Sequence, residues 1–359
     1  MASPAILLLE NEEPFYGAAM GSEGVAAGPM VVSTLAAGFS DLMTDPVYAG
    51  KIICFTYPHV GNTGIVPQDF QSDGSLCRAV AAREISRVKA NRLGVDTMDD
   101  YLKENYLPAI EGVDTRTLAE IVSRRGMVRA VLGTGKCADV ELLKKELASD
   151  LSFQPPAVGT RKAYEWKYAA STVKKKRIVV YDLGVKKGFL RRLSNIGCSV
   201  RVVPADCSAA DALAEQPDGV VFSAGPGTPE SRPETLNAVV DLLGKAPVWG
   251  VGIGAGLVAD AAGANVVVDG RGQFGCHPVG RPGESSAEMT MQCHEFWIEG
   301  ESLANANLQP THFNLNDGTL EGFACPERKI MGVLFHPESE PGQRDSLYLF
   351  DRFYEMMLK

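Results

Sequence analysis

The sequence lacks the features that direct a chain to a membrane or to secretion. No apolar run reaches the ~18 residues that a membrane-spanning helix needs. Residues 1–5 carry neither the charged segment nor the long apolar segment of a secretory signal. We therefore expect a cytoplasmic protein with no membrane association.

Paired cysteines are also absent. The eight cysteines stand singly, with no C-x-x-C motif, which argues against a zinc ribbon and against a disulfide framework. Cys276 and His277 are adjacent, but no second pair at ligand spacing accompanies them, so we expect no bound metal. Scattered single cysteines of this kind are typical of reduced thiols in a cytoplasm.

Positive charge is in deficit. Lys and Arg number 35 against 44 Asp and Glu, a formal net charge of −9, which disfavours nonspecific binding to nucleic acid. No internal repeat has solenoid spacing. The hydrophobic fraction of 45% and charged fraction of 22% are typical of a globular protein, and 359 residues suit two domains.

The first half of the chain predicts short strands followed by helices. Strand-like runs lie at 6–9, 30–34 and 51–56, and helical patterns at 98–104, 115–125 and 140–148, with Thr115 as the expected N-cap of the second helix. Residues 150–176 have little periodicity and end in the basic run 174–177. That run could bind an anion, but a solvated linker explains it more simply. We therefore expect domains at 1–150 and 177–359, joined by a linker over 151–176.

The second half alternates strictly between strands and helices. Strands are predicted at 177–181, 200–203, 219–222 and 248–251, and helices at 188–195, 209–215, 234–243 and, at the end of the chain, 346–357. This alternation is typical of βαβ units and a mostly parallel sheet. The fold class is therefore α/β, and ligands are expected at the carboxyl ends of the strands.

One of those strand ends has the layout of a nucleophile elbow without its nucleophile. Residues 247–257 read PVWGVGIGAGL, an apolar strand, a glycine-dense turn and the start of an apolar helix. The tip of the turn is Gly252, which has no side chain to react. Glycine there would release backbone strain or serve an anion-binding turn. The spacing fails the G-x-G-x-x-G pattern because residues 255 and 257 are Ala and Leu, so we expect no cofactor.

Short runs in both halves match one family. In the first half they are Thr44-Asp45-Pro46, residues 55–64 and residues 112–118; in the second half they are 181–186, 225–227, 317–322 and 336–338. Together these runs resemble the small subunit of carbamoyl-phosphate synthetase along nearly the whole chain. The resemblance implies an N-terminal mixed α/β domain peculiar to that family and a C-terminal class I glutamine amidotransferase domain with a flavodoxin-like sheet.

The resemblance also implies a partner and a reaction. The small subunit of this family hydrolyses glutamine, and the ammonia passes through a tunnel to a large subunit. The large subunit makes carbamoyl phosphate for pyrimidine and arginine synthesis. Hydrolysis needs a cysteine thiolate at the elbow, a histidine base, a glutamate that orients the base, and backbone N–H groups that stabilise the oxyanion.

The family's site residues are only partly present. His336 and Glu338 match the base and its orienting acid, and Gly225 and Gly227 match the oxyanion and substrate loop. The departures all fall on attack or on glutamine binding. They are Gly252 for the cysteine, Ala255 and Gly256 for His-Gln, Val47 for a serine, Ala224 for an asparagine, and Cys293-His294-Glu295-Phe296 for Asn-His-Gly-Phe.

These departures predict an inactive glutaminase, and three functions stay open. The chain could dock on a large subunit as a hetero-oligomer and support synthesis from free ammonia. It could be a regulatory module whose emptied pocket binds a small anion or metabolite. Glutaminase activity could survive through another thiol such as Cys293, although His294 beside it points to the opposite face of a strand. Without a nucleophile, His336 and Glu338 are more simply structural.

Overall fold

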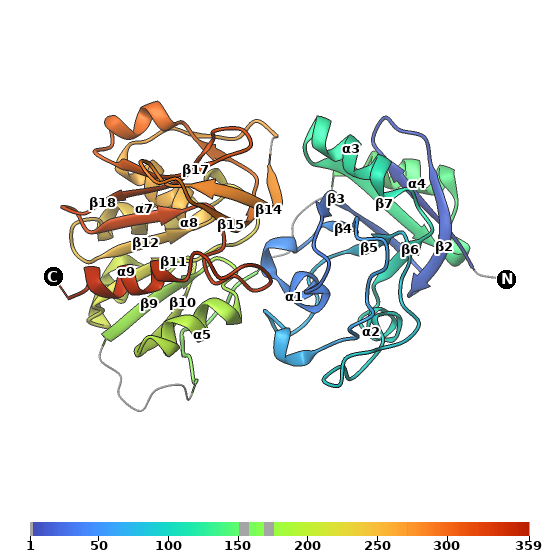
Figure 1. The fold of residues 1–359 in the computed structure, drawn as a ribbon, viewed down its shortest axis with the longest axis horizontal. Helices are drawn as coiled ribbons and strands as arrows, with labels where there is room; N and C mark the ends of the chain where they lie inside the picture. Colours follow the sequence, from blue (N-terminus) through green and yellow to red (C-terminus); the bar gives the residue numbers. More distant parts are fainter. Residues whose placement is uncertain (1–2, 151–157, 169–175, 271, 359) are drawn as a thin grey trace. The chain divides into compact units, whose positions relative to one another are not determined.

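The computed structural model describes residues 3–150, 158–168, 176–270 and 272–358. The chain divides into two compact units, Met1–Pro156 and Ala157–Lys359 (Figure 1). The expected N-terminal domain, 1–150, and the C-terminal domain, 177–359, each fall within one of these units. We describe each unit by itself.

The N-terminal unit is built on a closed barrel of seven strands. Its order is β1-β2-β6-β5-β4-β3-β7. Strands β3 to β6 pair in parallel in the order β3-β4-β5-β6, and the other pairs are antiparallel. The strands are β1 Pro4–Leu9, β2 Phe15–Gly21, β3 Val25–Ser33, β4 Ile52–Phe55, β5 Ala79–Ala82, β6 Pro108–Glu111 and β7 Val128–Thr134. The predicted runs at 6–9, 30–34 and 51–56 overlap β1, β3 and β4, respectively.

Alternate residues of these strands form a single apolar cluster. Leu7, Leu9, Ile52 and Cys54 belong to it, as the two-residue period of a strand requires. The helices of this unit are α1 Phe39–Thr44, α2 Met98–Glu104, α3 Thr115–Arg125 and α4 Val140–Leu147. Helix α3 adds its buried Leu118 and Ile121 to the same cluster. The amphipathic stripe predicted for 115–125 therefore faces the barrel.

The expected N-cap of α3 is wrong by one residue. The cap is Asp114, whose Oδ1 accepts hydrogen bonds from the backbone N–H groups of Arg116 and Thr117, each at 3.1 Å. Thr115 is the first helical residue instead. A carboxylate at this position also interacts favourably with the positive end of the helix dipole, which a neutral threonine does not. These hydrogen bonds lower the pKa of Asp114.

The C-terminal unit contains a ten-stranded sheet whose centre is parallel. The order is β15-β14-β17-β18-β19-β12-β11-β9-β10-β8, and the run from β19 to β10 is parallel. The central strands are β9 Lys176–Asp182, β10 Cys198–Pro204, β11 Gly219–Phe222, β12 Val248–Val251 and β19 Ile330–Val333. Four of these five correspond to the predicted strands, and the α/β class is confirmed.

Antiparallel strands that the periodicity did not predict flank this centre. They are β8 Tyr164–Glu165, β14 Gln273–Gly280, β15 Ala287–His294, β17 Gln309–Asn314 and β18 Leu320–Cys325. A separate two-stranded sheet pairs β13 Val266–Val267 with β16 Trp297–Ile298. Several of these strands bury polar side chains, such as Gln292, His312 and Glu321, so they lack the apolar alternation that identifies a strand.

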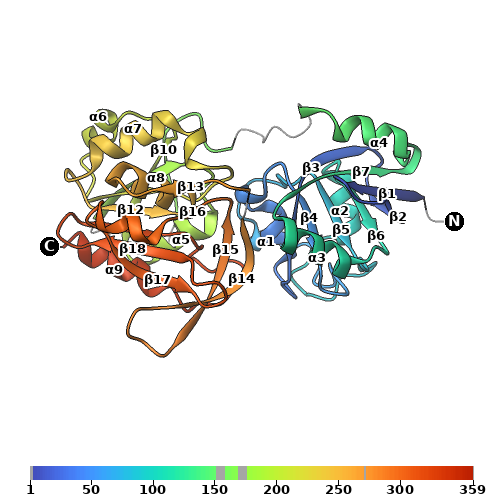
Figure 2. The same cartoon turned by 90° about the horizontal axis from the view of Figure 1, so that it is seen from above.

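Helices cover both faces of the central sheet (Figure 2). They are α5 Lys187–Asn195, α6 Ala209–Ala214, α7 Pro233–Leu242, α8 Ile253–Ala262 and α9 Tyr348–Met356. One face packs against α6, α7 and α8 through a hydrophobic cluster that includes Val220, Val239 and Val258. On the other face Trp249 contacts Phe189 of α5 and Phe353 of α9, each with ring centroids 5.3 Å apart.

The expected linker is partly structured. Residues 151–157 and 169–175 lie outside the described residues. The second of these ranges includes Lys174 and Lys175 of the basic run. Between them, β8 forms an edge strand of the sheet and pairs with β10, with Glu165 opposite Arg201. Lys176, the third basic residue of the run, begins β9, and its Nζ lies 2.8 Å from Asp218 Oδ1. Backbone pairing with an open sheet edge needs no apolar pattern, which explains why β8 was not predicted.

Two further features of the described residues concern membrane-spanning helices and metal sites. Across the described ranges, none of the helices combines the length and apolar character that crossing a bilayer requires. Within the same ranges, no three His, Cys, Asp or Glu side chains gather in a way that would hold a metal ion.

Candidate functional site

The elbow has the backbone of a nucleophile turn. Gly252 connects β12 to α8 with φ 55° and ψ −123°, and its N–H donates to Val333 O at 2.9 Å. Its carbonyl oxygen accepts the N–H groups of Ala255 and Gly256 in the first turn of α8. A side chain is strained at this φ, and active sites are where such strain is usually retained. Glycine adopts this conformation without the strain that a side chain would add.

Little room is left at the tip of this turn. A Cβ placed on Gly252 would lie 3.1 Å from Ala224 Cβ and 3.9 Å from Leu334 O. Ala224 belongs to the loop that follows β11, so the structure brings the elbow and the predicted oxyanion loop together. A side chain at position 252 would have to displace Ala224 by a few tenths of an ångström.

The predicted oxyanion loop, which follows β11, is packed tightly against Leu183 between β9 and α5. Ser223 Oγ accepts the N–H of Leu183 at 3.0 Å, and a Cβ on Gly225 would lie 1.8 Å from Leu183 O. Only glycine fits at 225 for this reason. Gly227 has a φ of 91°, a conformation that also favours glycine. Both glycines that the resemblance assigned to this loop are therefore required by its geometry.

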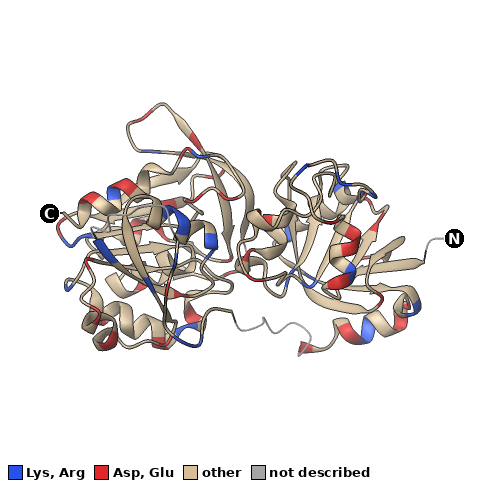
Figure 3. Cartoon of the chain, turned by 90° about the horizontal axis from the view of Figure 1, so that it is seen from below, with Lys and Arg blue, Asp and Glu red and all other residues tan. Residues whose placement is uncertain are grey.

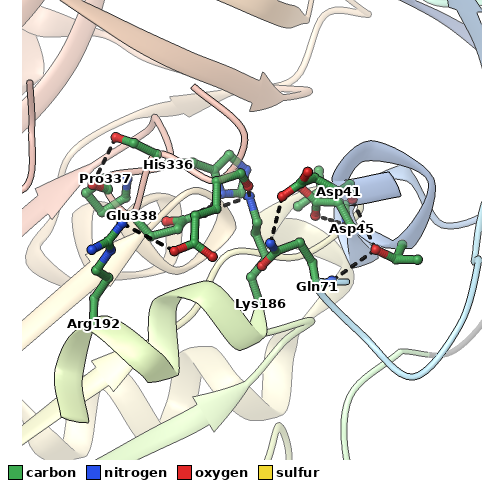
Figure 4. Close-up of polar contacts among 12 residues, drawn as sticks. Asp41, Asp45, Gln71, Lys186, Arg192, His336, Pro337 and Glu338 are labelled. Atoms are coloured by element: carbon green, nitrogen blue, oxygen red, sulfur yellow. Dashed lines mark hydrogen bonds and ion pairs between the residues drawn. The ribbon is translucent and has the colours of Figure 1, made fainter. Parts of the chain in front are cut away.

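His336 and Glu338 form the expected pair. His336 Nδ1 lies 3.1 Å from Glu338 Oε1, and both side chains are 1% exposed (Figure 4). The pair follows β19, and the N–H of His336 donates to Met291 O at 2.9 Å. Because Nδ1 is held by the carboxylate, Nε2 is the ring atom left for chemistry. Nε2 has no hydrogen-bond partner among the described residues.

A third charged residue completes this cluster. Lys186 Nζ lies 2.8 Å from Glu338 Oε1, is 1% exposed in its side chain, and also donates to the carbonyl oxygen of Glu340 (Figure 4). Burial raises the pKa of Glu338, but the nearby Lys186 and His336 charges outweigh burial and hold this pKa well below its usual range. Glu338 is therefore ionised, and its charge is compensated inside the unit.

The position of the family's glutamine-holding side chain is filled by other atoms. A Cβ on Gly256 would lie 2.6 Å from Phe296 Cε2 and 2.6 Å from Pro229 Cγ. Phe296 is 1% exposed and belongs to the hydrophobic cluster that packs against α8. The ring of Phe296 packs directly against α8 at Gly256. A glutamine residue at position 256 would therefore require this ring to move.

Comparisons with known proteins agree in both halves of the chain. The family model described as carbamoyl-phosphate synthase small chain, CPSase domain, matches residues 7–132, and the glutamine amidotransferase class-I model matches residues 179–356. A carbamoyl phosphate synthase small chain from Listeria innocua is 39% identical over 98% of this chain and 96% of the relative. The chain belongs to the carbamoyl phosphate synthase small-chain family.

Two further relatives extend the comparison. The carbamoyl phosphate synthase small chain of Thermosynechococcus vestitus is 37% identical over 99% of this chain and 97% of its own length. That of Pseudomonas syringae pv. tomato is 35% identical over the whole of both chains. The similarity to this family therefore covers both units, as the sequence resemblance predicted.

In this small chain, Cys293 and His294 do not pair with each other through the imidazole. His294 is 4% exposed; its Nδ1 lies 2.8 Å from Phe296 O and its Nε2 lies 3.2 Å from Gln292 Oε1. Glu321 Oε2 is 3.6 Å from the same Nε2. Burial lowers the pKa of His294, but Glu321 outweighs burial and the net shift is upward. Both ring nitrogens are therefore engaged by atoms other than the Cys293 thiol.

Glu295 and Val47 are the two remaining positions of the predicted glutamine pocket. Glu295 is half-buried between His294 and Phe296. Val47 belongs to the N-terminal unit of the small chain, where it is 2% exposed in the turn Pro46–Tyr48. Its N–H donates to Asp45 Oδ1 at 3.0 Å, and its carbonyl oxygen accepts Lys51 Nζ at 2.9 Å. In the same unit Gln71 Nε2 donates to Asp41 Oδ1 at 3.1 Å (Figure 4).

Lys186 is the site residue that sequence reasoning missed. It closes the run 181–186 that supported the family resemblance, but no role was assigned to it. A lysine directly before a helix is an ordinary surface pattern, and nothing local indicates burial. The available signal was its membership of a family motif at the carboxyl end of a predicted parallel strand, where functional groups gather.

Proposed function

We propose that this small chain does not hydrolyse glutamine and instead supports a large subunit that makes carbamoyl phosphate from free ammonia. The observation that carries the proposal is Gly252 at the tip of an intact elbow. Glutamine hydrolysis in this family begins when a thiolate adds to the amide carbon, and ammonia leaves as the thioester forms. With glycine at the tip, that carbon–sulfur bond cannot form.

The other groups of the site cannot replace the missing thiol. His336 accepts a proton from a nucleophile, so without one its Nε2 has nothing to activate at the elbow. The packing of Phe296 and Pro229 against Gly256 supports the loss of glutamine binding as well as of attack. The proposed remaining role is to pair with the large subunit in a cytoplasmic hetero-oligomer that supplies carbamoyl phosphate for pyrimidine and arginine synthesis.

Two assays on the purified chain test the proposal, with and without the large subunit of the same organism. Glutamate release from glutamine reports glutaminase activity, and carbamoyl phosphate formation is followed with ammonium chloride or glutamine as the nitrogen source. We expect synthesis from ammonia and no glutamate above the buffer background. Glutamate release well above that background would overturn the proposal.

Replacing the nucleophile position separates attack from substrate binding. Gly252→Cys restores a thiol, but we expect no normal glutaminase turnover because Phe296 and Pro229 still occupy the space beside Gly256. Gly252→Ala is the matched control, because it adds the same Cβ and the same backbone strain of ~1 to 3 kcal/mol without a thiol. Normal turnover by Gly252→Cys alone would show that the glutamine site is intact.

A second function is favoured by one observation, the buried Nε2 of His336, which has no hydrogen-bond partner in the part of the chain that the structure describes. In the first turn of α8 the N–H groups of Ala255 and Gly256 donate to Gly252 O, which leaves those of Ile253 and Gly254 for an anion, and a helix N-terminus favours negative charge. The emptied site would then bind a small anion or metabolite and act as a regulatory module. Titration calorimetry with bicarbonate and with glutamate, on the wild-type chain and on His336→Gln, tests this function. Binding that is lost in His336→Gln supports it, and no binding to the wild-type chain contradicts it.

A further inference from the structure

The first described segment of the C-terminal unit, residues 158–168, is a strap that pairs in part with the edge of the sheet. It contains the two-residue strand β8, and directly after β8 the N–H of Trp166 donates to Val200 O at 2.9 Å. The residues 151–157 join the strap to the N-terminal unit. A displacement of that connection therefore reaches the strap before the other described parts of the C-terminal unit.

The attachment of the strap at β8 is weak. Glu165 Oε1 lies 3.3 Å from Arg177 Nη2 and 3.9 Å from Arg201 Nη1, and Glu215 pairs with the same two arginines. Basic and acidic residues are interspersed over the unit as a whole (Figure 3), so this group gives the strap no special charge. The side chains of Glu165 and Arg177 are 47% and 39% exposed, and exposed ion pairs contribute little to stability.

A buried carboxylate provides the firmer attachment. Asp182, at the carboxyl end of β9, is 6% exposed, and its Oδ2 accepts the N–H of Thr160 at 2.8 Å. Gly159 approaches so closely that a Cβ at this position would lie 2.4 Å from Asp182 O. A hydrogen bond to an ionised group is stronger than one between neutral groups. Asp182 is therefore the main anchor of the strap.

The same carboxylate shapes the turn 183–185, which leads to Lys186. Asp182 Oδ1 accepts the N–H of Gly184 at 3.0 Å and that of Val185 at 2.8 Å. Gly184 has a φ of 128°, a conformation that favours glycine and leaves the turn dependent on its hydrogen bonds. Lys186 follows directly, with its Nζ 2.8 Å from Glu338 Oε1. One side chain thus joins the strap to the backbone that places this buried lysine.

We infer that the strap and the turn 183–185 form a conformational device in which release of the strap from Asp182 loosens the turn that positions Lys186. With the strap in place, the carboxylate is shielded from water, and water does not compete for the N–H groups of the turn. When the strap leaves, Asp182 Oδ2 meets water and the carboxylate gains freedom, so that strap and turn open together. Asp182 is then a positioning residue for Lys186.

This inference goes beyond the proposed function and does not depend on it. The contacts that carry it lie outside the elbow, so it holds whether or not the chain hydrolyses glutamine. Its consequence is that a displacement of the connection between the two units alters the buried cluster of Lys186, Glu338 and His336.

Hydrogen exchange of the whole chain, resolved by overlapping peptides, tests the coupling in Gly159→Ala. The added Cβ meets Asp182 O and is strained at a φ of 91°, so the strap is released while Asp182 and the turn keep their own residues. We expect exchange to rise by about tenfold or more both in residues 158–168 and in residues 183–186, the factor that corresponds to loss of a hydrogen bond to a charged group.

The matched control for this variant is Gly244→Ala. Gly244 has a φ of 80°, so an alanine there carries similar backbone strain, but the added Cβ would meet no described atom within 4 Å. We expect exchange in both ranges to stay within about twofold of wild type in this control. A rise confined to 158–168 in Gly159→Ala, no rise at all, or an equal rise in the control would each overturn the inference.

A second readout reports on Lys186 itself. If the strap positions this lysine, Lys186→Met should lower the urea midpoint of unfolding by about half as much, or less, in the Gly159→Ala background as in the wild-type background. Equal shifts of the midpoint in the two backgrounds would show that the strap does not act on Lys186.

The wild-type chain supplies a test that no misfolded variant can affect. In urea below the unfolding midpoint, a shared opening gives residues 158–160 and 183–186 the same free energy of opening and the same dependence on urea. Agreement of both quantities supports the device. Different values would mean that the strap and the turn open separately, and the inference would be wrong.

Discussion

The buried lysine beside Glu338 offers the most direct test of whether the remaining charged cluster supports the fold. Lys186→Met keeps a long side chain but removes the ammonium group that lies 2.8 Å from Glu338 Oε1. Both side chains are 1% exposed, so water cannot replace the lost partner. The variant therefore leaves a carboxylate in the interior with His336 as its remaining partner among the described residues.

The size of the effect follows from this geometry. At 2.8 Å and an effective dielectric constant of about 20, the attraction is about 6 kcal/mol. Relaxation of the surroundings and protonation of Glu338 would recover part of it, and removing one partner of a buried pair typically costs about 3 to 5 kcal/mol. We expect Lys186→Met to lower the free energy of unfolding of the C-terminal unit by about 3 to 5 kcal/mol at neutral pH.

Urea unfolding followed by tryptophan fluorescence measures this free energy in the correct unit. The three tryptophans of the chain, Trp166, Trp249 and Trp297, all lie in the C-terminal unit. Lys245→Met is the matched control, because Lys245 is exposed in a turn of the same unit, and we expect it to change stability by less than about 0.5 kcal/mol.

The stability difference between wild type and Lys186→Met should depend on pH. The pKa of Glu338 is lowered in the folded chain, so its ion pair contributes stability above the ordinary carboxyl pKa of about 4.3 and loses it as the pH falls toward the folded value. The difference between wild type and Lys186→Met should therefore narrow in acid. The double variant Lys186→Met/Glu338→Gln should be more stable than Lys186→Met. A cost below about 1 kcal/mol for Lys186→Met, or no gain in the double variant, would refute the reasoning.

Two further predictions concern other parts of the fold. Asp114→Ala removes the acceptor of the Arg116 and Thr117 N–H groups and should lower the midpoint of urea unfolding followed by circular dichroism, whereas Asp114→Asn should retain most of the cap. Burial lowers the pKa of His312 to about 4, so the folded chain should lose up to about 3 kcal/mol of stability as the pH falls from about 6.5 to 4. His312→Gln should flatten that slope, and an unchanged slope would contradict the assignment to His312.

The two units differed in how well their sequences predicted them. In the C-terminal unit the buried parallel strands are apolar runs separated by amphipathic helices, and this pattern survives without knowledge of tertiary contacts. In the barrel, strands such as β2 carry a run of small and half-buried residues that has no clear period. The antiparallel strands β15 and β17 bury polar residues that satisfy one another, such as His294 and Gln292, so their burial was not visible in the sequence.

The sequence by itself determined that glycine stands at the tip of the turn between β12 and α8, where the family resemblance predicts a cysteine. Gly252, His336 and Glu338 were identified from local motifs, because each motif is a short run whose chemistry depends on residue type. Only the tertiary structure decided which groups lie beside these positions. Lys186 meets Glu338 across 152 positions of sequence, and Phe296 fills the space beside Gly256 across 40. Contacts over such separations depend on how strands and helices pack, and no local pattern specifies that packing.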